Sequence, residues 1–176
     1  MEIRLEGKFL DVNALQRKLN TAVGEYAEKA VIALCEHGAK VAESNMGNFT
    51  GNASFSVGDV KRSNGVYEAS MIGKGDTIHR EWEVAGGGTH FEDINALLMA
   101  EFGSGFLADT SKFPNVRGVG QGTLNKYHHA FDEKGWFYTD DNGVLHHSYG
   151  TAPTHPMHKA DMAMMRDAER VLKGIK

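Results

Sequence analysis

The sequence predicts an α+β fold, and three stretches of the chain indicate it. A helical pattern runs from residue 12 to about residue 45, a stretch rich in turn signals follows at 55–84, and a second helical pattern begins near Pro156. Apolar spacing of three and four residues is typical of an amphipathic helix, whereas alternation over a few residues is typical of a strand. A chain of 176 residues suits one domain, so we expect residues 1–176 to form a single one.

The N-terminal part of the chain predicts an extended segment followed by a long helix. Residues 2–10 are expected to form a short strand or arm, and Asp11 is expected to cap the helix. Gly38 is expected to mark a kink or the end of this helix, because glycine is a poor helix former. The predicted apolar face consists of Leu15, Leu19, Val23, Tyr26, Ala30, Leu34 and Val41.

The middle of the chain predicts β-structure. Residues 55–57, 66–72 and 78–84 have strand-like patterns, with a turn signal at Ser63-Asn64-Gly65 and a break at 73–76. We expect these strands to form a three-stranded antiparallel meander.

The second half of the chain begins with a buried segment of unassigned type, 94–102, which glycines stop. Residues 106–150 are expected to form a long loop and hairpin insertion, with its strands at 136–139 and 144–147. The aromatic run Trp136, Phe137 and Tyr138 is typical of an interface core and would pack either on its own domain or on another subunit.

A second amphipathic helix is expected at the C-terminal end. Thr154 is predicted to cap it, with Pro156 in its first turn. Its predicted apolar face consists of Met157, Ala160, Met164, Ala168 and Val171.

The composition restricts the classes of function. The net charge of −4, without a basic block, argues against tight binding to phosphate backbones, which needs many Lys and Arg contacts. The one cysteine, Cys35, cannot form an internal disulfide. No apolar run of about 18 residues occurs, so no membrane span is expected.

No motif points strongly to catalysis. Gly73-Lys74-Gly75 lacks the spacing of a phosphate loop, and Ser104 lacks the flanking glycines of a nucleophile elbow. His129, His147 and Asp141 could converge on a metal ion, although nothing in their spacing requires it. We therefore expect no catalytic residue, metal or cofactor, and keep a small metal-dependent hydrolase and a host-directed binding module as alternatives.

Two short motifs appear in a fixed order along the chain, Glu101-Phe102-Gly103-Ser104-Gly105 after the β-rich stretch and Pro153-Thr154-His155-Pro156-Met157 at the last helix. With them the chain resembles the small neck or tail-completion proteins of siphophage-type bacteriophages. Members of that family typically carry a V-E-F-G-T-G-like stretch and a P-x-P-F-like stretch at these places. Their P-x-D-T-G-x-L stretch has only a partial counterpart here, Asn48-Phe49-Thr50-Gly51.

The resemblance implies a curved antiparallel sheet packed by a long N-terminal helix and a C-terminal helix. It also implies a structural virion protein that assembles in the bacterial cytoplasm into a ring, with a hexamer favoured, at the head–tail junction. Other neck and tail proteins would be its partners, and phage DNA would pass through without specific binding. The candidate interface residues are Glu101, Phe102, Gly103, Gly105, Trp136, Phe137, Tyr138, Pro153, Pro156 and Met157.

Overall fold

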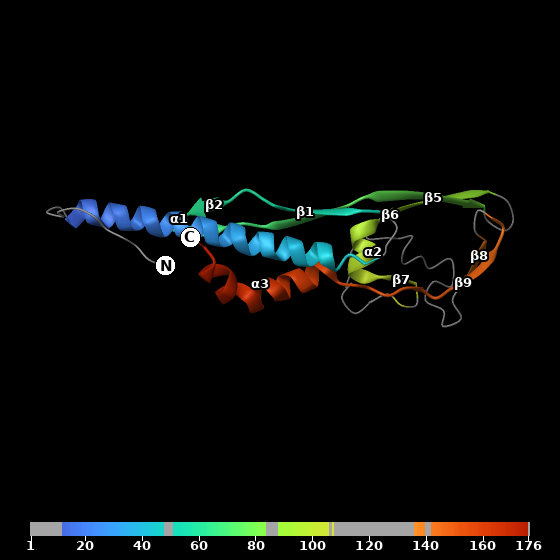
Figure 1. Cartoon of the computed structure of the whole chain (residues 1–176). Coiled ribbons are helices and arrows are strands. Elements are labelled where there is room, and N and C mark those ends of the chain that lie inside the picture. Colours follow the sequence, from blue (N-terminus) through green and yellow to red (C-terminus); the bar gives the residue numbers. More distant parts are fainter. Residues whose placement is uncertain are drawn as a thin grey trace. The chain divides into compact units, whose positions relative to one another are not determined.

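The computed structural model describes residues 12–47, 51–83, 88–105, 107, 136–139 and 142–175. Three helices and several short antiparallel strand pairs confirm the predicted α+β class (Figure 1). The helices are α1 (Val12–Ser44), α2 (Ala96–Phe102) and α3 (Pro156–Lys173). The strands are β1 (Ala53–Val57), β2 (Lys61–Ser63), β3 (Val66–Glu68), β4 (Met71–Gly75), β5 (Thr77–Glu83), β6 (Thr89–Asn95), β7 (Ser104–Gly105), β8 (Trp136–Thr139), β9 (Leu145–Ser148) and β10 (Gly150–Thr151).

The chain divides into two compact units. The first contains Met1–Val41, Phe55–Ile72 and Ala160–Lys176, and the second contains Ala42–Ser54 and Gly73–Lys159. The expectation of a single domain stays a prediction. The predicted arm at 2–10 and the predicted cap Asp11 lie outside the described residues.

In the first unit, α3 runs antiparallel to α1. The Tyr26 hydroxyl donates to the Leu172 carbonyl at 3.2 Å, and the His37 side chain contacts Asp167 further along both helices. The sequence predicted either a kink or the helix end at Gly38. The helix α1 continues through Gly38 to Ser44, so the prediction that it ends there is wrong. A Cβ at that position would lie 2.8 Å from the Met164 sulfur, so glycine makes room for α3 at this point.

Small side chains make up most of the buried apolar positions in the part of the chain that the structure describes. Cys35 and Ala39 on α1 are buried in the first unit, together with Ala160 and Ala163 on α3. Small residues let two helix backbones approach closely, but each buries little apolar surface. Large apolar side chains elsewhere, such as Phe91, remain exposed.

The β2–β3 hairpin lies against α1 in the same unit. Its two-residue turn, Asn64-Gly65, has positive φ at both positions, 50° and 76°, as the expected turn signal requires. Tyr67 occupies the space that a side chain at Gly24 would fill, and Arg62 forms an ion pair with Glu28. The Arg62 guanidinium also lies 5.6 Å from the Tyr67 ring centroid.

The predicted three-stranded meander is wrong in its pairing. Residues 66–72 divide into β3 and part of β4, and β1 pairs with β4 across the β2–β3 hairpin. A break was expected at 73–76, but only Asp76 lies outside a strand, between the end of β4 and the start of β5. The Asp76 N–H donates to Asn52 O at 2.8 Å and its carbonyl accepts from Ala96 N at 2.9 Å, so β1 and β6 approach the same edge of the β4–β5 stretch.

Strand β6 was not predicted, and it supplies the partner of β5. The two strands pair antiparallel over seven residues, from Thr77↔Asn95 to Glu83↔Thr89. The segment Thr89–Asn95 is mostly polar, so no apolar alternation revealed it. The predicted late hairpin is confirmed, since β8 pairs with β9 from Trp136↔Ser148 to Thr139↔Leu145.

Candidate functional site

The first motif begins within the last turn of a short, mostly buried helix, α2. Asn95 caps this helix, because its side-chain oxygen accepts from Leu97 N and Leu98 N, both at 3.1 Å. The Asn95 amide also donates to Gly75 O at 3.1 Å, which ties the cap to β4. Residues 94–102, whose type the sequence left open, thus comprise the end of β6 and a helix with most of its residues buried.

Glu101 at the end of α2 serves as the N-terminal cap of α3. Its side chain is buried, with 9% of the residue exposed. One carboxylate oxygen accepts from Met157 N at 2.7 Å and the other accepts from His158 N at 3.2 Å. These are the second and third residues of α3, whose N–H groups have no partner within the helix. The negative charge also lies at the positive end of the helix dipole, which stabilises it.

The turn from α2 into β7 requires glycine at position 103. Gly103 has φ of 76° and donates its N–H to Met99 O at 2.7 Å. A Cβ there would lie 2.5 Å from Thr151 O and 2.9 Å from Pro153 Cδ. A side chain is therefore excluded both by backbone conformation and by the second motif itself.

The second motif is bound to α2 by backbone hydrogen bonds. Strand β10 pairs with β7, with Gly150 opposite Gly105 and Thr151 opposite Ser104. Thr154 N and His155 N both donate to Ala100 O, at 2.8 and 3.1 Å.

The prediction that Thr154 caps the last helix is wrong. Its hydroxyl lies 3.3 Å from both Met46 O and Ala100 O and can donate its one proton to either carbonyl, so it points toward preceding elements. The helix begins at Pro156, as the proline position suggested, and a side chain from a distant segment, Glu101, replaces the local cap.

We call the residues Glu101, Phe102, Gly103, Gly105, Pro153, Pro156 and Met157 the motif junction. These seven predicted interface residues belong to two segments about fifty positions apart, and the structure brings the segments together. The other three predicted residues, Trp136, Phe137 and Tyr138, lie on β8, where the backbone register is described. Phe137 lies opposite His147 in that register.

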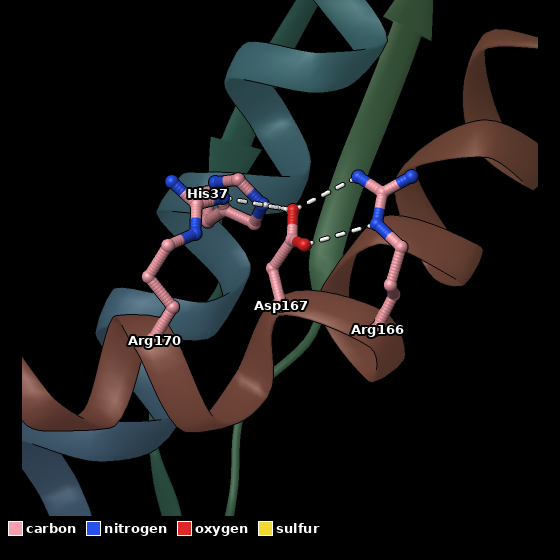
Figure 2. Close-up of polar contacts among 4 residues, drawn as sticks. All are labelled: His37, Arg166, Asp167 and Arg170. Atoms are coloured by element: carbon pink, nitrogen blue, oxygen red, sulfur yellow. Dashed lines mark hydrogen bonds and ion pairs between the residues drawn. The ribbon is translucent and has the colours of Figure 1, made fainter.

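A second polar cluster in the first unit was not predicted. Figure 2 shows Arg166 on one side of the Asp167 carboxylate, and His37 and Arg170 on the other side. Asp167 accepts from His37 Nε2 at 2.9 Å and from Arg166 Nε and Nη2 at 2.9 and 3.0 Å, and Arg170 forms an ion pair with it at 2.9 Å. The hydrogen bonds from Arg166 and from His37 hold the pKa of Asp167 well below its usual range. The sequence does contain a signal for this cluster, because Asp167 is an acidic residue at a position where the apolar face of α3 is expected to continue.

The described residues contain no group of three or more His, Cys, Asp or Glu side chains that could hold a metal ion. Of the proposed metal ligands, His129 and Asp141 lie outside the described residues. The third, His147, packs edge-on against the Tyr149 ring with a centroid distance of 4.5 Å. Cys35 is buried, and burial raises the pKa of its thiol, which disfavours the reactive thiolate.

A scan against protein-family models found no match, and searches of the curated proteins and of the solved structures found none either. Within the described part of the chain, no helix has the length and apolar character needed to cross a membrane.

Proposed function

We propose that this chain is a structural subunit of the head–tail junction of a tailed bacteriophage, a neck or tail-completion protein that acts without catalysis. The observation that carries the proposal is the motif junction. The two segments on which the resemblance rests are not independent turns, since Glu101 caps α3 and Gly103 lies against Pro153. Their joint appearance in the sequence therefore has one physical cause.

The distribution of apolar side chains supports assembly into an oligomer. Among the described residues, the buried apolar positions are mostly alanines, while Leu145 and Met165 are 66% and 61% exposed. Large apolar side chains on a subunit surface are typical of sites that another protein covers. In the proposed function, these contacts would build the ring and join it to other neck or tail proteins.

Native mass spectrometry of the full-length protein, with and without a chelator, tests the proposal. We expect a ring-sized oligomer, a hexamer in the favoured case, whose mass the chelator does not change. A bound mass that the chelator removes would contradict the proposal and favour the metal-dependent hydrolase.

Mass spectrometry of purified phage particles provides the second test. We expect the chain in the particles at a few copies, far fewer than the major tail protein. A chain found in the infected host but not in the particles would contradict the proposal and favour the host-directed binding module.

A further inference from the structure

Among the described residues, no strand pairs with the edge of β6 that faces away from β5, and we call this the free edge. In the described part of the chain the sheet contains these two strands only. The bond from Ala96 N to Asp76 O shows that the even-numbered residues of the pair exchange hydrogen bonds, because bonded and non-bonded pairs alternate along an antiparallel ladder. The N–H and C=O groups of Thr89, Phe91 and Asp93 therefore point away from β5.

Three features that often protect a strand edge, namely proline, lysine and a β-bulge, are absent from β6. The segment Thr89–Asn95 contains neither proline nor lysine, and its register with β5 is unbroken, so no bulge interrupts it. The opposite edge, on β5, carries Glu81 at an outward position. If β5 paired with β5 of a second copy about an axis at Glu81, the two Glu81 carboxylates would lie opposite one another and repel.

Phe91 stands at the centre of the free edge. It is 70% exposed, and it lies directly across from Glu81 in the register. The next outward residue, Asp93, is already paired with His79 on the neighbouring strand. On the Phe91 face of β6, the next positions along the strand are therefore Thr89 and this paired aspartate.

We propose that β6 pairs antiparallel with β6 of a second copy of this chain, about a two-fold axis at Phe91. In this register Phe91 lies opposite the partner's Phe91, and Thr89 lies opposite the partner's Asp93. All three positions carry outward backbone groups, so each pair closes two backbone hydrogen bonds. The two phenyl rings form a cross-strand aromatic pair, and the threonine hydroxyl can donate to the carboxylate.

The charges on this face select the register. With strands about 4.8 Å apart, the two Glu81 side chains would be roughly 14 Å from one another across the four-stranded sheet, beyond the screening length of about 8 Å at physiological salt. Moving the axis by one residue toward Asp93 would place Phe91 opposite the partner's Asp93, an apolar ring against a carboxylate. The register centred on Phe91 avoids this mismatch.

The inference stands on the β5–β6 pair alone and does not depend on the proposed function. A two-fold contact uses the same surface on both subunits and cannot by itself close a ring. Loss of the pairing would therefore leave ring-sized oligomers intact, and loss of the ring would leave the pairing intact.

Disulfide trapping in the full-length protein tests the register. Directly opposite, hydrogen-bonded residues have Cα atoms about 5.5 Å apart, which suits a disulfide. With copper–phenanthroline as the oxidant, we expect Phe91→Cys to give a covalent dimer on a non-reducing gel. Asp93→Cys should give none, because its counterpart lies roughly 14 Å away along the strands. Combining Thr89→Cys with Asp93→Cys should restore the dimer.

Sedimentation equilibrium provides the second measurement, the dissociation constant of the dimer in variants with no introduced cysteine. We expect Phe91→Asp to raise the dimer dissociation constant by about tenfold or more, and Phe91→Tyr to leave it near the wild-type value. Leu145→Asp, an equally exposed apolar position on β9, is the matched control and should change it little. Equal trapping at positions 91 and 93, or a dimer unaffected by Phe91→Asp, would overturn the proposal.

Discussion

Replacing Glu101 with alanine removes the cap of a helix that begins more than fifty residues later in the chain. The carboxylate accepts two backbone hydrogen bonds, at 2.7 and 3.2 Å, and the residue is 9% exposed. Loss of a local cap costs about 0.5–2 kcal/mol, and a hydrogen bond to a charged group contributes about 1.5–3 kcal/mol. Since the substitution removes a buried cap of this kind, we expect the free energy of unfolding to fall by about 2–4 kcal/mol.

Urea unfolding followed by circular dichroism measures this change, and thermal unfolding gives a second reading. For a chain of this size about 1 kcal/mol corresponds to 2–4 °C, so Tm should fall by about 5–15 °C. Glu101→Gln should cost less, about 1–2 kcal/mol, because the amide oxygen can still accept one bond while its NH₂ group meets backbone donors.

The matched control is Glu169→Ala on the same helix. The Glu169 side chain is 83% exposed and forms a surface ion pair with Lys173, so its loss should cost about 0.5 kcal/mol or less. If Glu101→Ala unfolds within about 0.5 kcal/mol of the wild type, the carboxylate does not hold the start of α3 and the reasoning fails.

Three further substitutions test other contacts. Gly103→Ala should lower the free energy of unfolding by about 2 kcal/mol or more in urea titrations, whereas Gly65→Ala, which also has positive φ but open space around it, should cost only about 1 kcal/mol. Gly24→Ala should displace the Tyr67 ring and lower Tm, and a wild-type tyrosine near-ultraviolet spectrum in the variant would argue against the contact. The folded state lowers the pKa of Asp167, so this group stabilises the fold above the unfolded value of about 3.9 and loses that contribution as pH falls further. Asp167→Asn should therefore lower Tm at pH 7, and the difference between the variant and the wild type should narrow below about pH 3.9.

The two long helices, α1 and α3, were predictable because their signals are local, whereas the type of the segment that contains α2 was left open. Apolar spacing placed α1 within one residue of its observed end, and Pro156 marked the start of α3. Asn64 and Gly65 identified their turn because few residues adopt positive φ there.

The strand pairing was not predictable, because partners are chosen by contacts that no local pattern contains. Gly73 and Gly75 read as a break, yet both lie within β4. The glycine at 75 is needed because a Cβ would lie 2.5 Å from Leu97 N of α2, a contact set by the tertiary fold. Thr154 failed as a cap for the same reason, since a distant carboxylate took that position.

The strand pair β7–β10 has a consequence for the segment between its strands. Gly105 lies opposite Gly150, so both ends of residues 106–149 are fixed at one point by backbone hydrogen bonds. The entropy of closing a loop grows only with the logarithm of its length, about 0.6 kcal/mol for each doubling. Evolution or an engineer can therefore lengthen, shorten or exchange this segment while the motif junction keeps its geometry, which makes residues 106–149 a natural place to graft a new binding specificity.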